Sequence, residues 1–330
     1  MTTETSGCHS KLFLSCDLTG STAFKQRPNP GSETPWQKVF LQFYREFPQQ
    51  LYLEQKAMGA EHIEFKLWKP VGDELIFTCD VRSEADIYDA VTIWHETMSA
   101  YKNNHLDDTQ LGVKGGAFIA TFPGPDSQST IPRDPASETS GRDVVVLNQE
   151  AIEAPPAHQR YLYDYFGPSI DTGFRVISKC TERYMTLSLE VAYAISLLHF
   201  DKGARGESRD VSNLMLLESL GLKGVWGGRT YPLFALDLEA DSAIAAAFRQ
   251  FSPWQYDTAA IHDLCKALYS DVAWPFKLHL PDSTTGLFSQ VQPDPLAQYL
   301  ANASIASEGA ETLATEPPGA QQLKEDPPLG

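Results

Sequence analysis

The chain has 330 residues, of which 42% are hydrophobic and 21% charged, so it is long enough for one large domain or two small ones. This composition excludes wholesale disorder, a coiled coil and a collagen-like chain. Acidic residues outnumber basic ones by 43 to 26, and the net charge of −17 repels nucleic acid and anionic lipid, so we expect neither as a partner.

Targeting signals and cysteine usage point to the cytoplasm. No apolar run approaches the ~18–20 residues that span a bilayer, and the first residues lack the basic and apolar regions of a signal peptide. The five cysteines, an odd number without a Cys-x-x-Cys pair, favour neither a disulfide framework nor a metal knuckle. We therefore expect a soluble protein of the reducing cytoplasm, with no membrane partner.

The first third of the chain alternates strand and helix signals. The first helix is expected to stop at Gly59 and the second to be capped by Ser83. The turn sequence Val71-Gly72-Asp73-Glu74 separates two strand-like runs and predicts a β-hairpin. The order βαββαβ predicts an α+β fold with a ferredoxin-like core. The predicted elements cover residues 11–17, 36–53, 62–70, 75–79, 83–104 and 111–122.

The rest of the chain is less regular. Residues 123–157 are rich in Pro, Ser, Thr and Asp, which predicts a loop insertion around a short strand at 144–147. A strand-turn-helix follows over 161–180, and 231–238 is the last strand-like run. We predict a main domain over 1–238, an accessory helical extension over 239–300 and a disordered acidic tail over 301–330.

The first segment with chemical potential is Asp17-Leu18-Thr19-Gly20-Ser21-Thr22. An aspartate at the carboxyl end of a strand can bind a hard divalent cation, while N–H groups of the following turn cradle phosphate oxygens. An ordinary strand end with an Asx-type turn explains the segment equally simply.

The second segment is Lys69-Pro70-Val71-Gly72-Asp73. A hairpin aspartate is usually only a turn former. In a split-βαβ fold, however, the first strand and the hairpin strands are neighbours, so Asp17 and Asp73 come close enough to share metal ions. Two ions about 3.5–4 Å apart clamp the attacking and leaving oxygens of an in-line phosphoryl displacement.

The third segment runs from Tyr163 to Arg175. Pro168 suits the first turn of a helix, which places Asp171 and Arg175 four residues apart on one face. This pattern is either an ordinary ion pair on a helix or an arginine directed at a triphosphate, where a guanidinium neutralises developing charge.

In this order the segments resemble the class III nucleotide cyclases, the adenylate and guanylate cyclase catalytic domains. The family's Asp-hydrophobic-x-Gly-Ser-Thr motif is matched by 17–22, and its Lys-x-hydrophobic-Gly-Asp motif by 69–73. Its Tyr-Asp-x-x-Gly turn is matched by 163–167, with Asp171 and Arg175 at the positions of its Asn and Arg. Leu222-Lys223-Gly224 is similar to the segment before the last family strand. The resemblance covers residues 11–238.

The resemblance implies a role for each matched residue. It implies two Mn²⁺ or Mg²⁺ ions as cofactors and a head-to-tail homodimer that shares its active sites across the interface. The reaction would be attack of the ribose 3′-hydroxyl on the α-phosphorus of a nucleoside triphosphate, with release of pyrophosphate. The implied metal ligands are Asp17, Leu18 through its carbonyl, and Asp73; the nucleotide-binding residues are Thr19, Gly20, Ser21, Thr22, Lys69 and Asp164; the catalytic residues are Arg175, Lys223 and Asp171.

Within the family, the 167–175 segment looks like the pyrimidine cyclases of bacterial antiphage Pycsar systems. That branch makes cyclic UMP or cyclic CMP, which a separate effector protein reads. Uracil and cytosine can both be met by a lysine donor beside an aspartate acceptor, so UTP is the first expectation and CTP the alternative. Bulky Tyr165 and Phe166 could narrow the base site.

Two other functions stay open. Asp171 replaces the usual asparagine near the ribose, which favours a cyclase-like domain that binds nucleotide without turnover. Another nucleotidyltransferase on the same core is the third alternative. It draws on the acidic pair of Gly72-Asp73-Glu74, although Val71 stands where diguanylate cyclases carry a further glycine.

Overall fold

The computed structural model describes residues 7–26, 35–107, 109–138, 141–200, 210–240, 242–297 and 299–302. These form two compact units, the first comprising 1–128 and 164–293 and the second 129–163 and 294–330. From residue 303 on, the predicted acidic tail lies outside the described residues. The predicted division at Leu238 stays a prediction.

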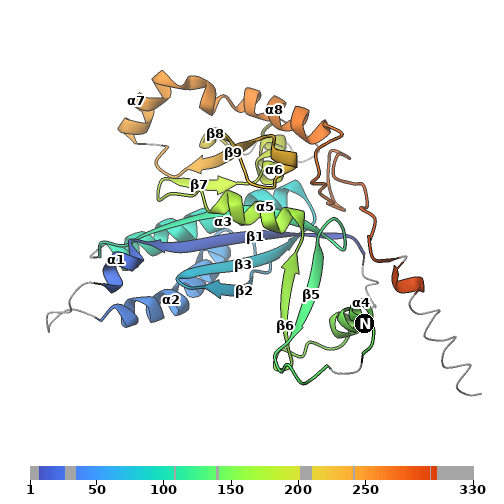
Figure 1. The fold of residues 1–330 in the computed structure, drawn as a ribbon. Coiled ribbons are helices and arrows are strands. Elements are labelled where there is room, and N and C mark those ends of the chain that lie inside the picture. The colour runs from blue at the N-terminus through green and yellow to red at the C-terminus, as the bar shows by residue number, and fades with distance from the viewer. Residues whose placement is uncertain are drawn as a thin grey trace, which may run out of the picture. The chain divides into compact units, whose positions relative to one another are not determined.

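The first unit is built on a seven-stranded sheet with the order β2-β3-β1-β4-β7-β9-β8 (Figure 1). The pairings β1–β3, β1–β4 and β2–β3 are antiparallel, and β4–β7 is parallel. The order β2-β3-β1-β4 is that of a split-βαβ core, so the predicted α+β fold and its βαββαβ order are confirmed. The strands are β1 (His9–Thr19), β2 (Lys66–Val71), β3 (Glu74–Val81), β4 (Gly112–Phe122), β7 (Tyr184–Leu187), β8 (Leu214–Gly221) and β9 (Thr230–Asp237).

The two faces of this sheet are covered unequally. Alternate residues of β1, such as Leu12 and Leu14, belong to the large core that also contains side chains of α2, α3 and α6. Phe13 points the other way and packs in a small cluster with Ile170 and Ile177 of α5. The helices of the first unit are α1 (Ser21–Lys25), α2 (Trp36–Ala57), α3 (Glu84–Tyr101), α5 (Pro168–Ile177), α6 (Leu189–Phe200), α7 (Ala243–Phe251) and α8 (Thr258–Ser270), with short helical turns at Lys102–Leu106, Trp226–Gly228 and Pro253–Tyr256.

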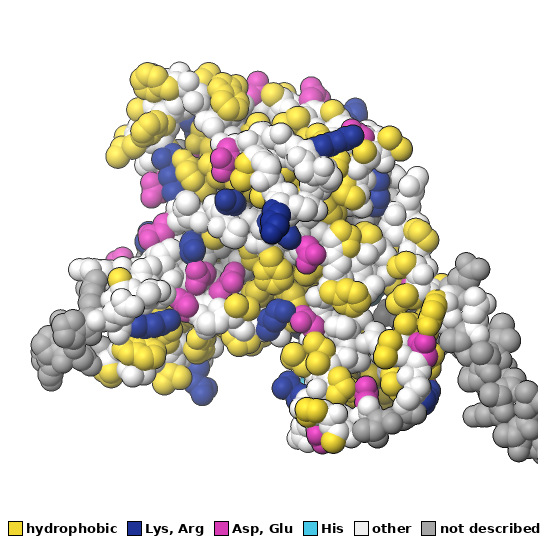
Figure 2. Space-filling view, in the orientation of Figure 1, with side chains coloured by type: hydrophobic (Ala, Val, Ile, Leu, Met, Phe, Trp, Pro, Cys, Tyr) yellow, Lys and Arg dark blue, Asp and Glu magenta, His cyan; other side chains and the backbone are white. Residues whose placement is uncertain are grey.

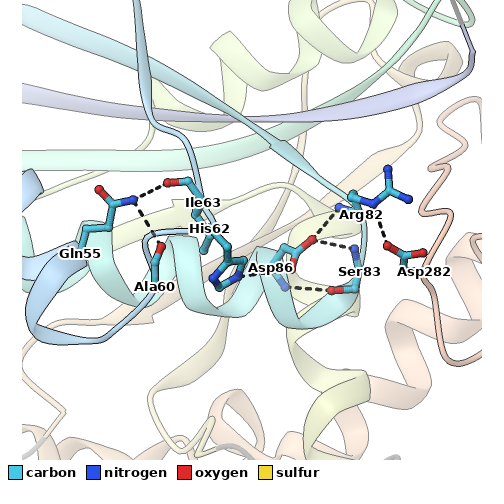
Figure 3. Close-up of polar contacts among 8 residues, drawn as sticks. All are labelled: Gln55, Ala60, His62, Ile63, Arg82, Ser83, Asp86 and Asp282. Carbon is cyan, nitrogen blue, oxygen red and sulfur yellow. Dashed lines mark hydrogen bonds and ion pairs between the residues drawn. The ribbon is translucent and has the colours of Figure 1, made fainter. Parts of the chain in front are cut away.

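The predicted start of α3 is confirmed by a complete capping box (Figure 3). Ser83 Oγ accepts a hydrogen bond from the Asp86 amide at 3.2 Å, and the Asp86 carboxylate accepts from the amides of Ser83 and Arg82 at 3.1 and 2.8 Å. Arg82 also pairs with Asp282 at 2.7 Å. Near the end of α2, Gln55 donates to the backbone carbonyls of Ala60 and Ile63, which lie on the connection from α2 to β2.

The second unit contains one helix where a strand was predicted. Residues 144–147 begin α4 (Val144–Glu153), because the Asp143 carboxylate accepts hydrogen bonds from the amides of Val145 and Val146 at 2.8 and 3.4 Å. This N-cap outweighs the strand preference of three consecutive valines. The chain enters and leaves this unit along a two-stranded sheet of β5 (Ser127–Pro132) and β6 (Tyr161–Phe166).

Two further expectations need correction. Strand β8 was not predicted at all, although it pairs with β9 along most of its length. The extension 239–300 is only partly helical, because α7 and α8 are followed by an irregular segment from Asp271 on.

In the part of the chain that the structure describes, no helix combines the length and the apolar character needed to cross a membrane. All five cysteines are free thiols, and Cys16, Cys79 and Cys265 are buried.

Candidate functional site

The candidate site lies on the sheet face that carries Phe13, Ser15 and Asp17 of β1, which we call the outer face. Helix α5 covers part of this face through the small hydrophobic cluster, and polar side chains occupy the part beyond it. Figure 2 shows acidic side chains over the end of β1 and the β2–β3 turn, hydrophobic side chains in the middle, and basic side chains on both sides of them.

Three carboxylates meet at one end of the outer face, and we call Asp17, Asp73 and Glu74 the acidic site. The β1–β3 register places Asp17 directly opposite Glu74, and the Leu18 amide donates to the Asp73 carbonyl at 3.4 Å. Burial raises the pKa of Asp17, the hydrogen bond and charge of Lys114 lower it, and the charge of Asp73 raises it again, with a net rise. The pKa of Glu74 is raised by burial and by the charge of Asp17. The carboxylates therefore lie close enough to repel one another.

Two lysines neutralise this charge. Lys114 Nζ lies 3.2 Å from a carboxylate oxygen of Asp17, and Lys25 Nζ lies 3.5 Å from one of Asp73. The sequence reasoning missed both. Lys114 could have been found, because the ferredoxin-like order puts its strand beside β1, and alternation then predicts which face it shares.

Metal binding at the acidic site can be tested against the side chains present. Among the described residues, no group of three or more His, Cys, Asp or Glu side chains is arranged to hold a metal ion. Asp17 on β1 and Asp73 in the β2–β3 turn nevertheless supply hard carboxylate oxygens, and their mutual repulsion favours an added cation. The acidic site therefore supplies oxygen ligands of the kind that a hard divalent cation prefers.

The turn after β1 adopts the shape that its glycine requires. Gly20 has φ +74°, and a Cβ at this position would lie 3.2 Å from the Gln110 carbonyl oxygen, so only glycine fits without strain. The Thr19 hydroxyl donates to Glu182 and accepts from the Gly112 amide, so it is already bonded within the protein. Beyond Gly20, Ser21 is buried and Thr22 is exposed.

The two residues expected to face the base are in direct contact. Lys69 Nζ on β2 lies 2.8 Å from an Asp164 carboxylate oxygen on β6, and this oxygen also accepts from the Tyr165 amide at 2.9 Å. A β-bulge leaves Trp68 without a partner residue on β3, and the Lys69 ammonium lies 3.9 Å from the Trp68 ring centroid.

The Lys69–Asp164 pair stands beside a set of packed rings that we call the aromatic wall. Trp68 lies 5.1 Å from Phe13, 5.3 Å from Tyr165 and 6.0 Å from Phe174, measured between ring centroids. Burial raises the pKa of Tyr165 to about 12. Sequence reasoning named Tyr165 as bulky but did not find Trp68, because a bulge cannot be read from alternation.

Arg175 lies in a separate pocket of about 440 Å³, which we call the arginine pocket. Its guanidinium donates to the backbone carbonyl of Asp171, so the carboxylate–guanidinium ion pair considered from sequence is not formed. Lys223 is exposed and precedes the pocket residue Gly224. The lining comes from α5, the β8–β9 turn and the C-terminal extension: Pro168, Asp171, Thr172, Arg175, Gly224, Val225, Trp226, Gly227, Arg229, Ala273, Pro275 and Phe276.

A buried carboxylate fixes the helix that carries Arg175. Gly167 and Pro168 open α5 without a side-chain cap of their own, and the Asp126 carboxylate, 0% exposed, accepts from the Ser169 amide at 2.8 Å instead. A Cβ on Gly167 would lie 2.3 Å from Asp126 Oδ1, so the close approach needs glycine. Sequence reasoning did not find Asp126, which lies far from α5 along the chain.

The acidic site and the arginine pocket are not joined within one chain. Among the described residues, no hydrogen bond or ion pair links Asp17 or Asp73 to Arg175. The structure thus brings together the two aspartates, and separately Lys69 with Asp164 and Arg175 with Asp171.

Comparisons with known proteins give structural likenesses only. No protein-family model matches the chain, and no curated protein matches it. The adenylyl cyclase CyaB from P. aeruginosa is similar to 69% of this chain over 94% of its own, at 12% identity and a TM-score of 0.45. The catalytic core of a rhodopsin-guanylyl cyclase with converted specificity, in complex with ATPαS, is similar to 72% of this chain over 100% of its own, at 12% identity and a TM-score of 0.43.

A bacterial light-regulated adenylyl cyclase is similar to 79% of this chain over 98% of its own, at 9% identity and a TM-score of 0.40. All three TM-scores are below 0.5.

Proposed function

We propose that this protein is a metal-dependent nucleotide cyclase. The observation that carries the proposal is the acidic site, in which β1–β3 pairing brings Asp17 and Asp73 together from distant parts of the chain. Two neighbouring aspartates beside a glycine turn suit the metal ions and phosphates of a nucleoside triphosphate. Arg175 supplies the positive charge that a triphosphate needs.

Each residue of the proposed site has a distinct role. Asp17, Asp73 and the Leu18 carbonyl would hold two Mn²⁺ or Mg²⁺ ions, which lower the pKa of the ribose 3′-hydroxyl when bound. The turn Thr19–Thr22 contacts the phosphates, while Arg175 and Lys223 neutralise charge on the leaving pyrophosphate. Asp171 lies one helical turn before Arg175, on the pocket lining, where a ribose hydroxyl could satisfy its carboxylate.

We further propose a pyrimidine substrate, UTP first and CTP as the alternative. The Lys69–Asp164 pair offers one donor and one acceptor to a base edge, and the Trp68 bulge adds a large ring beside them. A single-ring base needs less room next to such a wall than a purine. The products are 3′,5′-cyclic UMP or cyclic CMP and pyrophosphate, and the role proposed is that of a cytoplasmic antiphage messenger read by a separate effector.

The proposal includes a homodimer. Because no hydrogen bond or ion pair between described residues links the acidic site to Arg175, a head-to-tail pair of chains could complete each active site with the arginine pocket of its partner. Two complete sites per dimer would result.

The decisive experiment measures product. The purified protein is incubated with Mn²⁺ and each of the four nucleoside triphosphates in turn, and cyclic nucleotide is detected by mass spectrometry. We expect cyclic UMP from UTP, or cyclic CMP from CTP. No cyclic product from any of the four would contradict the cyclase proposal, and cyclic AMP or GMP alone would contradict the pyrimidine proposal.

Sharing of the site is tested by mixing variants. Asp73→Ala and Arg175→Ala should each be inactive alone, because each removes one half of every site. Their mixture should regain about a quarter of wild-type activity, because random pairing makes half the dimers mixed and each mixed dimer has one intact site. A mixture as inactive as its parents would contradict the shared site.

A second candidate function is nucleotide binding without turnover. It is favoured by Asp171 at the asparagine position and by the lysines that already neutralise Asp17 and Asp73. Calorimetry that finds triphosphate binding, with the substrate recovered intact after long incubation with Mn²⁺, would support it against the cyclase.

A further inference from the structure

The arginine pocket holds a second guanidinium that the cyclase motifs do not include. Arg229, directly before β9, lines the pocket together with Arg175. Its Nη1 lies 3.5 Å from an Asp271 carboxylate oxygen, and its guanidinium carbon lies 5.2 Å from the Trp226 ring centroid. The Arg229 side chain remains 55% exposed, so its other N–H donors are available to a ligand.

The segment of the C-terminal extension that lies beside Arg229 is anchored in the core. Trp274 is 2% exposed, and its indole N–H donates to the buried Glu190 carboxylate at 2.9 Å. The Trp274 ring also packs on Trp226 and Tyr231 at centroid distances of 5.0 and 5.8 Å. The neighbouring wall residues, Ala273 and Pro275 to Phe276, are therefore held against the sheet by their own segment.

The β8–β9 turn is strained and is locked to that wall. Trp226 has φ +46° and is the one non-glycine residue with positive φ in the described part of the chain. Its indole N–H donates to the Ala273 carbonyl at 3.1 Å, which ties the turn to the C-terminal extension. Gly224 and Gly227 also have positive φ, and turns of this kind direct backbone N–H groups toward anions.

The two guanidinium groups of the pocket suit an extended anion. Arg175 and Arg229 line it; Asp171 lies on the lining at the exposed side of α5, and Asp271 is ion-paired with Arg229. A guanidinium matches phosphate oxygens with paired donors, and two guanidinium groups can meet successive phosphates of one chain. Trp226 and Phe276 supply the apolar part of the lining.

We propose that Arg229 is a second phosphate-binding residue beside Arg175, and that the C-terminal segment Asp271–Phe276 is the wall that positions it. The ligand is a linear polyphosphate, either the triphosphate of a nucleotide or the released pyrophosphate. This inference rests on the proposed function, and it gives the C-terminal extension a part in the active site.

The test measures polyphosphate binding to the full chain by isothermal titration calorimetry, with sodium tripolyphosphate and inorganic pyrophosphate in separate titrations. Arg229→Ala should weaken binding about tenfold, as expected for loss of one charge-assisted contact, and Arg229→Lys should recover part of it. The matched control is Arg82→Ala, because Arg82 is also exposed and also ion-paired with the C-terminal extension, at Asp282. The Arg82→Ala protein should bind both probes with the affinity of the wild type. If tripolyphosphate binds more tightly, the natural ligand of the pocket is the triphosphate of the substrate. If pyrophosphate binds more tightly, the natural ligand is the released product.

An Arg229→Ala protein that binds both probes as tightly as the wild type would overturn the inference, and so would a wild-type chain that binds neither. If Arg229→Ala does not fold, the comparison of Arg229→Lys with Arg229→Gln decides, because equal affinities of the charged and the neutral variant overturn the inference. Failure of the cyclase proposal is seen separately, as absence of cyclic product from the wild type. A chain that makes cyclic nucleotide and is unaffected at Arg229 would leave the cyclase proposal intact.

Discussion

The acidic site and the arginine pocket lie on the same unit but are built in opposite ways. The acidic site collects negative charge on two paired strands, and lysines from α1 and β4 neutralise it. The arginine pocket collects positive charge on a helix and a turn, and Arg175 is bonded to a backbone carbonyl rather than to a carboxylate. The two regions therefore carry opposite charge, negative at the acidic site and positive at the arginine pocket.

The supports of the two regions also differ. Asp17 and Asp73 are positioned by strand register and by the Leu18–Asp73 backbone hydrogen bond, so local pairing suffices. The arginine pocket depends on distant buried groups, Asp126 at the start of α5 and Glu190 behind Trp274. Variants at these supports should therefore separate effects on chemistry from effects on stability.

The largest expected effect is at the acidic site. Asp17→Asn should lower the cyclisation rate by about a thousandfold, because loss of a metal-holding carboxylate removes several kcal/mol of transition-state stabilisation. The variant should melt at or above the wild-type temperature, since the pKa of Asp17 is raised by burial and its charge is costly in the fold. Cyclic-nucleotide formation and thermal unfolding are measured side by side.

The matched control is Asp80→Asn. Asp80 lies on β3 and pairs with Lys11 across β1 and β3, much as Asp17 pairs with Lys114, but it lies outside the acidic site. Its activity should be unchanged. Activity of Asp17→Asn within tenfold of this control would show that the acidic site is not where the chemistry occurs.

The next effect concerns the buried support of the arginine pocket. Burial raises the pKa of Glu190 to about 7, above the value of an unfolded glutamate. A raised folded-state pKa means that this group favours folding most below about pH 4 and that the benefit is lost as the pH rises to about 7. Glu190→Gln stays neutral and still accepts from Trp274, so at pH 8 it should unfold with a free energy up to about 3 kcal/mol above the wild type.

Urea unfolding at pH 5, 6, 7 and 8 measures this difference, which should grow from pH 5 to about pH 7 and then level off. Glu218→Gln, an exposed glutamate on β8, serves as the control and should follow the wild type at each pH. If the free energies of unfolding of Glu190→Gln and of the wild type differ by the same amount at all four pH values, the raised pKa of Glu190 would be contradicted.

A smaller effect is expected at the cap of α5. Asp126→Ala removes the acceptor of the Ser169 amide and should lower the free energy of unfolding by about 1–2 kcal/mol. Asp126→Asn keeps an acceptor oxygen and should cost much less. Chemical denaturation of both variants measures the difference, and equal stabilities would mean that Asp126 does not cap the helix.

The smallest effect is at the lysine beside Asp73. Lys25→Ala should strengthen Mn²⁺ binding by a few-fold, because the half-buried Lys25–Asp73 ion pair, of about 1 kcal/mol, no longer competes with the metal. Calorimetric titration with MnCl₂ measures the affinity. Lys11→Ala, which breaks the Lys11–Asp80 pair instead, should leave it unchanged. Weaker binding by Lys25→Ala would mean that Lys25 supports the site rather than competing for it.

Much of the core could be predicted because its signals are local. The Ser83 cap, the Gly72 turn and the alternation of β1 each act over a few residues, and together they give the βαββαβ order. The strand order follows from that pattern, so the meeting of Asp17 and Asp73 could also be anticipated.

The two errors in secondary structure have a common cause, which is an interaction that outweighs the local propensity. Residues 144–147 have strand propensity, but the Asp143 carboxylate caps a helix there. Strand β8 has weak alternation of its own and is defined by pairing with β9. Propensity is a weak signal wherever a cap or a partner strand supplies more free energy than the local preference.

From its sequence alone, this protein is determined to have a split-βαβ core in which Asp17 of β1 comes close to Asp73 of the neighbouring hairpin turn, because hydrophobic alternation and turn residues specify strand order. Only the tertiary structure decided which cations neutralise those aspartates, that Trp68 bulges beside Lys69, and that Arg229 and the C-terminal extension share a pocket with Arg175. These contacts join residues distant along the chain, and their geometry depends on how side chains pack in three dimensions, which no local pattern encodes.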